Sequence, residues 1–159
     1  MKVKKLSLLA IFISLSVVGA MIKVPAPISS VALDLLPALV GVVVLGRNAG
    51  SLVACLGHLL SALFGGMPLG PFHMLIAFEM ALLVYGFGYI YQKGKRILAA
   101  IFLVIGNTFV ASLPFLFIIG IGFYVGMIPS LFIGSVINAA LAIILAPSVE
   151  TYFVKRLHI

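Results

Sequence analysis

The sequence is poor in charged residues. Asp, Glu, Lys and Arg together make up 8% of its 159 residues, whereas hydrophobic residues make up 64%. Soluble domains carry about 25% charged residues, and a soluble core could not use so much apolar surface. The composition therefore indicates an integral membrane protein. The apolar runs are continuous and do not alternate with polar residues, so they exclude β-barrel strands and predict membrane-spanning helices.

Cysteine and the common catalytic motifs are also scarce. Cys55 is the only cysteine, which excludes an internal disulfide and a multi-cysteine metal site. The chain has no GxxxxGK[ST] phosphate loop, no HExxH zinc motif and no GxSxG nucleophile elbow. His58 and His73 fall on different predicted helices, so their spacing predicts no metal site. We therefore expect no cofactor, no bound metal and no catalytic residue.

Acidic residues are the third shortage. Three Asp and Glu stand against ten Lys and Arg, which gives a net charge of +7. In a soluble chain this charge would suggest a nucleic-acid partner, but in a membrane protein it reports topology, because Lys and Arg collect in cytoplasmic loops. We predict no nucleic-acid binding. The basic first residues before an apolar run also resemble a signal peptide, with Val18-Gly19-Ala20 as its cleavage site, but the apolar rest of the chain favours a first membrane span.

The apolar segments predict six spans. They cover residues 6–24, 31–46, 50–64, 72–91, 97–119 and 124–147. With the N-terminus inside, nine of the ten Lys and Arg lie on the cytoplasmic side and only Lys23 lies outside, in agreement with the positive-inside rule. We predict an all-α fold. It is a single domain over residues 1–159, an integral membrane bundle of six transmembrane helices with both termini cytoplasmic, in the cell membrane.

A Gly/Pro-rich corner, Gly65–Pro71, separates the third and fourth predicted helices. His58, His73 and Glu79 lie on either side of it, inside otherwise hydrophobic sequence. A charge at the centre of a membrane costs roughly 2.5–3.5 kcal/mol on insertion scales, so such residues indicate a functional site. In the six-span topology the corner faces outwards. We therefore predict a pocket that opens to the outside and is built around these residues.

Three more polar residues fall at a similar depth. Asp34 is predicted in the first turn of the second helix, where its charge either favours the helix dipole or contacts a ligand. Asn107 and Asn138 lie near the middle of the fifth and sixth helices, where an amide either binds a ligand or forms a hydrogen bond inside the bundle. No ladder of charges reaches the inner face. This argues against a stand-alone channel or proton relay.

Two runs, Val18–Leu39 and Gly57–Tyr89, resemble the substrate-binding S components of energy-coupling factor (ECF) vitamin transporters. Within that family both runs are similar to S components assigned to α-ribazole, the dimethylbenzimidazole nucleoside salvaged for cobalamin synthesis, and the second run is the more specific of the two. The resemblance covers nearly the whole chain and implies a non-catalytic subunit that binds its vitamin in the outer half of the membrane. It also implies that one transmembrane subunit and two ATPase subunits supply the energy for uptake.

The resemblance also implies roles for residues. The family contacts its transmembrane subunit through an AxxxA-like pair on the first helix, which reads Ala10-x-x-x-Ser14 here, with serine at the second position. Packing inside this bundle is the alternative use of such small residues. Apolar and aromatic walls would hold the heterocycle of α-ribazole, namely Met67, Phe72 and either Phe115 or Tyr124. Polar side chains would meet its hydroxyls and free ring nitrogen: Asp34, His58, His73, Glu79, Asn107 and Asn138.

Other classes of function stay open at this point. An intramembrane enzyme would use His58, Ser61, His73 and Glu79 as acid–base groups, although the nucleophile arrangement and the metal spacing are missing. An assembly protein would bind no small ligand and would have a filled interior. Within the transporter class, the substrate is α-ribazole or another vitamin, such as pantothenate, thiamin or a precursor.

Overall fold

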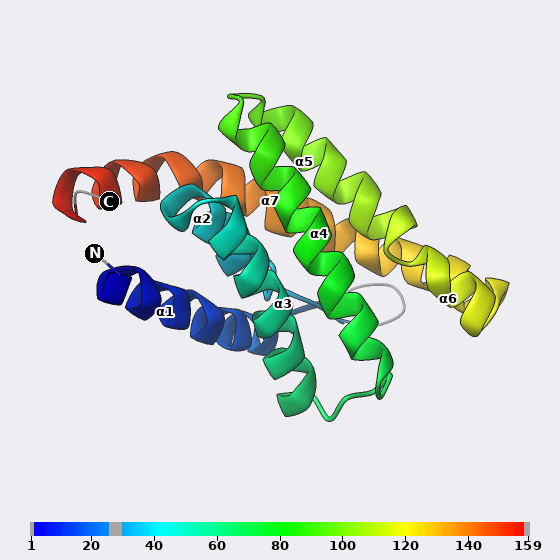
Figure 1. The fold of residues 1–159 in the computed structure, drawn as a ribbon. Coiled ribbons are helices and arrows are strands. Elements are labelled where there is room, and N and C mark those ends of the chain that lie inside the picture. The colour runs from blue at the N-terminus through cyan, green and yellow to red at the C-terminus, as the bar shows by residue number, and fades with distance from the viewer. Residues whose placement is uncertain (1, 26–29, 158–159) are drawn as a thin grey trace.

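The protein is a bundle of helices joined by tight turns, with one short β-hairpin after the first helix (Figure 1). The computed structural model describes residues 2–25 and 30–157. Its elements are α1 (Lys2–Met21), β1 (Lys23–Pro25), β2 (Ser30–Ala32), α2 (Leu36–Leu45), α3 (Arg47–Phe64), α4 (Phe72–Gln92), α5 (Arg96–Ile105), the π-helix η1 (Gly106–Val110), α6 (Leu113–Ile118) and α7 (Ile121–Leu157).

Four helical segments of the described chain are long and apolar enough to cross a membrane. They are Val3–Met21, Phe72–Gln92, Arg96–Ile118 and Ile121–Phe153. Each overlaps a predicted span, so the prediction of a helical membrane protein is confirmed. The second and third predicted spans correspond to α2 and α3, which lie between the first two of these segments, and α2 has only 10 residues.

Helix α2 begins at Leu36, later than the predicted start at residue 31. Two features explain the difference. The residues just before it pair as strand β2, and Pro37 occupies the first turn, where its fixed φ angle suits the start of a helix. Asp34 therefore lies in the bend that precedes α2, and its predicted place in the first turn of the helix is wrong.

The hairpin closes tightly against the end of α1. Strands β1 and β2 are antiparallel, with Lys23 opposite Ala32. Residues 26–29, which join the two strands, lie outside the described residues. The Leu33 N–H donates to the Gly19 carbonyl at 3.1 Å. Because a Cβ at Gly19 would collide with the Leu33 carbonyl, this glycine lets the segment before α2 pack against α1.

The fifth predicted span, residues 97–119, is interrupted. The helix changes to π form over Gly106–Val110, and α6 starts at Leu113. Pro114 explains the restart, because proline has no N–H to donate to the preceding turn but fits the first turn of a new helix. Such π segments are frequent at functional sites, and Asn107 lies in this one.

The last helix, α7, is longer than the predicted span of residues 124–147. It starts at Ile121, directly after Gly120 with its positive φ of 119°, and runs for 37 residues. Pro129 and Pro147 lie inside it without ending it. In a membrane protein, neighbouring helices and hydroxyl side chains can satisfy the carbonyls that a proline leaves free.

Helix α3 packs against α1, α2 and α4, whereas α5 packs against α4 and α7 (Figure 1). Helices α1 and α3 approach closely at Gly57, where a Cβ would collide with the Ser16 side chain. Helix α1 is also the least buried of the four candidate spans, with 17% of its window buried. The largest fully buried side chains include Leu39, Val42, Val53, Val84, Phe87 and Leu103.

Candidate functional site

A cavity of about 330 Å³ lies between the bend before α2 and the helices α3, α4, η1 and α7. Its walls are mostly apolar and carry a few polar groups. Small-molecule sites have this composition and occupy about 300–1,000 Å³. The lining residues are Ala32, Asp34, Leu35, His58, Leu69, His73, Ile76, Met80, Asn107, Gly126, Met127, Ser130, Leu131 and Asn138.

Two histidines on facing helices form a directed chain of hydrogen bonds. His58 Nε2 lies 3.1 Å from His73 Nδ1, and the Leu69 N–H donates to His73 Nε2 at 3.4 Å. Since Nε2 of His73 accepts, a neutral His73 carries its proton on Nδ1 and donates it to His58. A neutral His58 then carries its own proton on Nδ1. The chain thus begins in the Gly65–Pro71 corner and ends at an N–H donor of His58.

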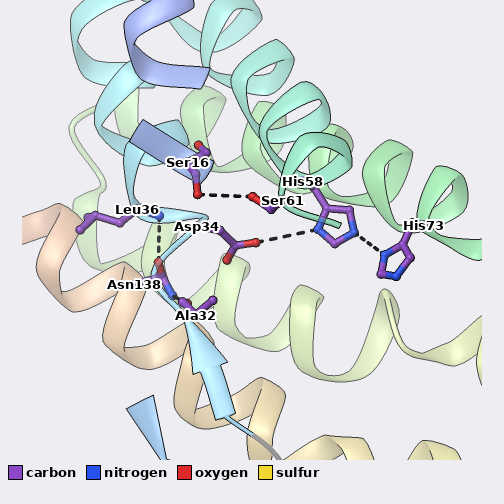
Figure 2. A network of polar contacts seen from close by, with 8 residues as sticks. All are labelled: Ser16, Ala32, Asp34, Leu36, His58, Ser61, His73 and Asn138. Carbon is purple, nitrogen blue, oxygen red and sulfur yellow. Dashed lines mark hydrogen bonds and ion pairs between the residues drawn. The ribbon is translucent and has the colours of Figure 1, made fainter. Parts of the chain in front are cut away.

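That N–H donor faces a carboxylate across the edge of the cavity (Figure 2). His58 Nδ1 lies 3.9 Å from Asp34 Oδ2, which is too long for a direct hydrogen bond. Nδ1 is buried and has no hydrogen-bond partner among the described residues. A buried donor without a partner costs about 1–3 kcal/mol. The pair therefore offers one donor and one acceptor to a ligand that enters between them.

Asn138 holds the bend that carries Asp34. Its side-chain oxygen accepts from the Leu36 N–H at 2.8 Å, and its amide nitrogen donates to the Ala32 carbonyl at 3.0 Å (Figure 2). The same nitrogen donates to the Gly134 carbonyl at 2.9 Å. The oxygen and both N–H groups are thus engaged within the bundle. Asn138 lines the cavity, but its polar atoms bind the backbone of Ala32 and Leu36, on either side of Asp34, and so hold Asp34 in place.

The opposite side of the cavity carries two more polar groups. The Asn107 amide nitrogen donates to the Ser135 hydroxyl at 2.7 Å, and its side-chain oxygen has no hydrogen bond within the described part of the chain. The Ser130 hydroxyl, five residues before the serine that Asn107 contacts, is buried and has no hydrogen-bond partner among the described residues. The π segment and α7 thus add an acceptor and a hydroxyl to the cavity.

The apolar walls come from side chains that sequence reasoning did not single out. Ile76 and Met80 share a face of α4 with His73, and Met127 faces them from α7. Methionine side chains are flexible and polarisable, so they fit flat rings of different shapes. The signal available in the sequence was helical spacing, because residues three and seven positions after His73 lie on its side of the helix.

Five of the eight predicted ligand-contact residues line the cavity, and three do not. Phe72 packs edge to face on Phe115, with ring centroids 6.0 Å apart. Met67 lies in the corner with a positive φ of 49°. Glu79 is half-buried, and its Oε2 atom is buried without a hydrogen-bond partner in the described structure.

The comparisons with known proteins identify the family of this chain and support its fold. Residues 4–155 match the family model described as "ECF transporter, substrate-specific component", so the chain belongs to that family of S components. S components are substrate-binding transporter subunits without catalytic activity, and separate partner subunits hydrolyse ATP. Family membership therefore sets aside the interpretation as an intramembrane enzyme.

The fold also matches solved structures. Among them is the S component of a bacterial ECF transporter, described for its structure and mechanism, which is 23% identical to this chain with a TM-score of 0.74. The match covers 96% of this chain and 99% of that one. At this identity the likeness concerns the fold. No curated protein matches the sequence.

Proposed function

We propose that this S component binds α-ribazole in the cavity with high affinity and passes it to its partner subunits for import across the plasma membrane. The observation that carries the proposal is the His58 N–H, which has no hydrogen-bond partner among the described residues and faces the Asp34 carboxylate in a mostly apolar cavity. α-Ribazole has the matching parts. Its flat dimethylbenzimidazole is apolar, its free ring nitrogen accepts a hydrogen bond, and its ribose hydroxyls donate them.

These parts suggest one arrangement in the cavity. The heterocycle lies between the thioethers of Met80 and Met127, and its free nitrogen accepts from His58 Nδ1. A ribose hydroxyl then donates to Asp34, and others reach Asn107 and Ser130. A site built to pair such groups discriminates strongly, because an analogue that lacks them leaves buried polar atoms unsatisfied.

We also propose six membrane-embedded helices with both termini cytoplasmic. The guanidinium of Arg47 lies 5.0 Å from the Tyr85 ring centroid and 5.4 Å from that of Tyr89, and Lys93 also contacts the Tyr89 ring. These basic and aromatic groups gather at one end of α4, as at a cytoplasmic membrane interface. His73 lies about 24 Å away along the same helix. The cavity therefore belongs to the outer half.

The partner contact is proposed on the free side of α1. Ala10 and Ser14 are both exposed, and the Ser14 hydroxyl donates to the Ala10 carbonyl at 3.0 Å, which leaves a surface of small groups. Two helices approach closely over such a surface. Ala10→Leu should abolish uptake in cells that contain the partner subunits and leave ligand binding intact. Ser14→Ala, which keeps a small residue, should retain uptake. Full uptake by Ala10→Leu would place the contact elsewhere.

Calorimetry on the purified protein in detergent tests the substrate. We expect tight binding of α-ribazole and at least about tenfold weaker binding of 5,6-dimethylbenzimidazole, which has no hydroxyl to offer Asp34. Pantothenate and thiamin serve as comparison vitamins. Tight binding of one of them in place of α-ribazole would keep the S-component function and discard this substrate. Failure of a folded sample to bind any of the four would contradict the proposed ligand chemistry of the cavity.

A further inference from the structure

A second hollow in the surface lies between α5 and α7, and it is almost wholly apolar. Its volume is about 580 Å³. Ile97 and Ile101 of α5 and Phe132 and Ile144 of α7 line it, and all four are exposed, with Ile97 at 66% and Ile144 at 69%. This groove contains none of the residues that line the substrate cavity.

The length of the groove matches one leaflet of a membrane. Its lining runs from Ile97 to Ile105 on α5 and from Phe132 to Ile144 on α7. At a rise of 1.5 Å per residue these segments span about 12 and 18 Å. Half of the hydrocarbon core measures about 15 Å. One acyl chain of a single leaflet would therefore fill it from end to end.

The charge around the groove is confined to one end. The sequence from Ile97 to Val149 contains no Asp, Glu, Lys, Arg or His. Directly before it, a basic turn is formed by Lys93 and Lys95, between α4 and α5, together with Arg96, the first residue of α5. Because Arg96 lies 4.0 Å from Glu150 of α7, the basic turn stands at the Ile144 end of the groove.

Two of the basic side chains in this turn have no acidic partner among the described residues. The Lys93 ammonium donates to the Tyr89 hydroxyl at 2.7 Å and lies over its ring, and Lys95 is exposed. The single carboxylate, Glu150, is about half exposed and pairs with Arg96 at long range. Positive charge is thus in excess at the place where a lipid headgroup would lie.

We propose that the α5–α7 groove is a binding site for one anionic phospholipid of the leaflet that the basic turn faces. An acyl chain fills the groove, and the phosphate of the headgroup binds Lys93 and Lys95. The apolar groove matches the length of an acyl chain, and the basic residues at one end of it match the charge of an anionic headgroup. The site is independent of the substrate, and the helix proposed for partner contact, α1, packs on α2 and α3 rather than here.

Native mass spectrometry on the purified protein tests the site with two lipids that share their acyl chains, dioleoyl phosphatidylglycerol and dioleoyl phosphatidylcholine. We expect a preference of at least about tenfold for the anionic lipid, because each basic side chain near an anionic headgroup contributes about fivefold in affinity. Equal binding of the two lipids would overturn the proposal. Inorganic phosphate should not displace the lipid, and displacement at millimolar concentration would indicate a site for a free anion.

Separate variants test the contribution of the basic side chains and that of the apolar groove. The double variant Lys93→Gln/Lys95→Gln should lose the preference for the anionic lipid, whereas Lys4→Gln/Lys5→Gln, which removes the same charge from α1, should keep it. Ala140→Trp places a ring in the groove and should weaken binding of both lipids. Thermal unfolding shows that each variant is folded. A preference that survives the Lys93/Lys95 change, or full lipid binding by folded Ala140→Trp, would contradict the proposal.

Discussion

Only one of two sides of α4 lines the cavity, although both carry polar or aromatic residues close to the Gly65–Pro71 corner. One side bears His73, Ile76 and Met80 and forms a wall of the cavity. The other bears Phe72 and Glu79, which lie seven residues apart and hence on one face of the helix. Phe72 packs against α6, so this side turns towards the neighbouring helices and away from the cavity.

The comparison shows that the cost of a polar residue in the membrane does not by itself identify a ligand contact. Glu79 would carry the largest cost of these residues if charged, yet the cavity takes its carboxylate from Asp34, in a bend outside the helices. Rotation around the α4 axis decides which side chains meet a ligand. The four predictions below test that division, with the binding of α-ribazole as the measured quantity.

The largest effect is expected for the carboxylate on the cavity side. Asp34→Asn keeps the size of the side chain and removes its charge. A hydrogen bond to a charged group contributes about 1.5–3 kcal/mol, so affinity should fall by about 10–100-fold. Calorimetry measures this loss, and thermal unfolding should show little change because the side chain is partly exposed. Wild-type affinity in this variant would remove Asp34 from the site.

A smaller effect is expected for the neighbouring pair at the start of α4. His73→Ala removes the contacts to His58 and to the Leu69 N–H, so the His58 donor is no longer held in place. We expect about tenfold weaker binding. Phe72→Ala is the matched change on the other face and should lower the melting temperature while affinity stays within about twofold. Equal losses of affinity in both would show that the two faces do not differ.

The apolar wall gives the next effect. Met80→Phe enlarges a buried side chain in the cavity and should weaken binding by about fivefold, because overpacking a well-filled site costs about 1–3 kcal/mol. Met80→Leu, which conserves volume, should bind nearly as well as the wild type. Calorimetric titrations of both variants distinguish the effect of side-chain volume from the effect of replacing the thioether. If the phenylalanine variant binds more tightly, the wall contacts the ligand less closely than we infer.

The smallest effect is expected at Glu79. Its sequence context predicts that Glu79→Gln weakens binding, whereas its position outside the cavity predicts a change of less than about twofold. The variant therefore decides between the two arguments. Calorimetry beside a thermal unfolding curve is needed, because a half-buried carboxylate also affects stability. A tenfold loss of affinity at unchanged stability would show that the ligand reaches the second face of α4.

Much of the fold could be predicted from the sequence. Hydropathy identified the four candidate spans and the corner at Gly65–Pro71, because long apolar runs and Gly/Pro clusters are local signals. Two local features escaped prediction. The start of α2 follows a segment that pairs with β1, and the π segment Gly106–Val110 comes before the restart at α6. Pro37 and Pro114 are local signals for the two helix starts, but strand pairing and π geometry have no comparable pattern in the residues.

The candidate site was predictable in its residue types and only partly in its geometry. His58, His73 and Asn107 stood out because a polar side chain in an apolar run is costly. The structure shows in addition that the Asn138 amide forms hydrogen bonds with the backbone around the bend before α2, which the residue type alone does not reveal. It also adds Met80 and Met127, which are unremarkable in an apolar sequence.

The sequence by itself determined that the chain is a helical membrane protein, because hydropathy and charge act residue by residue and need no partner. It also determined the residue types that a site could use. Only the tertiary structure decided which face of α4 meets the cavity, how the proton of His58 is directed towards Asp34, and where the α5–α7 groove meets the basic turn. Those features depend on the rotation and crossing of helices, which packing between distant segments sets.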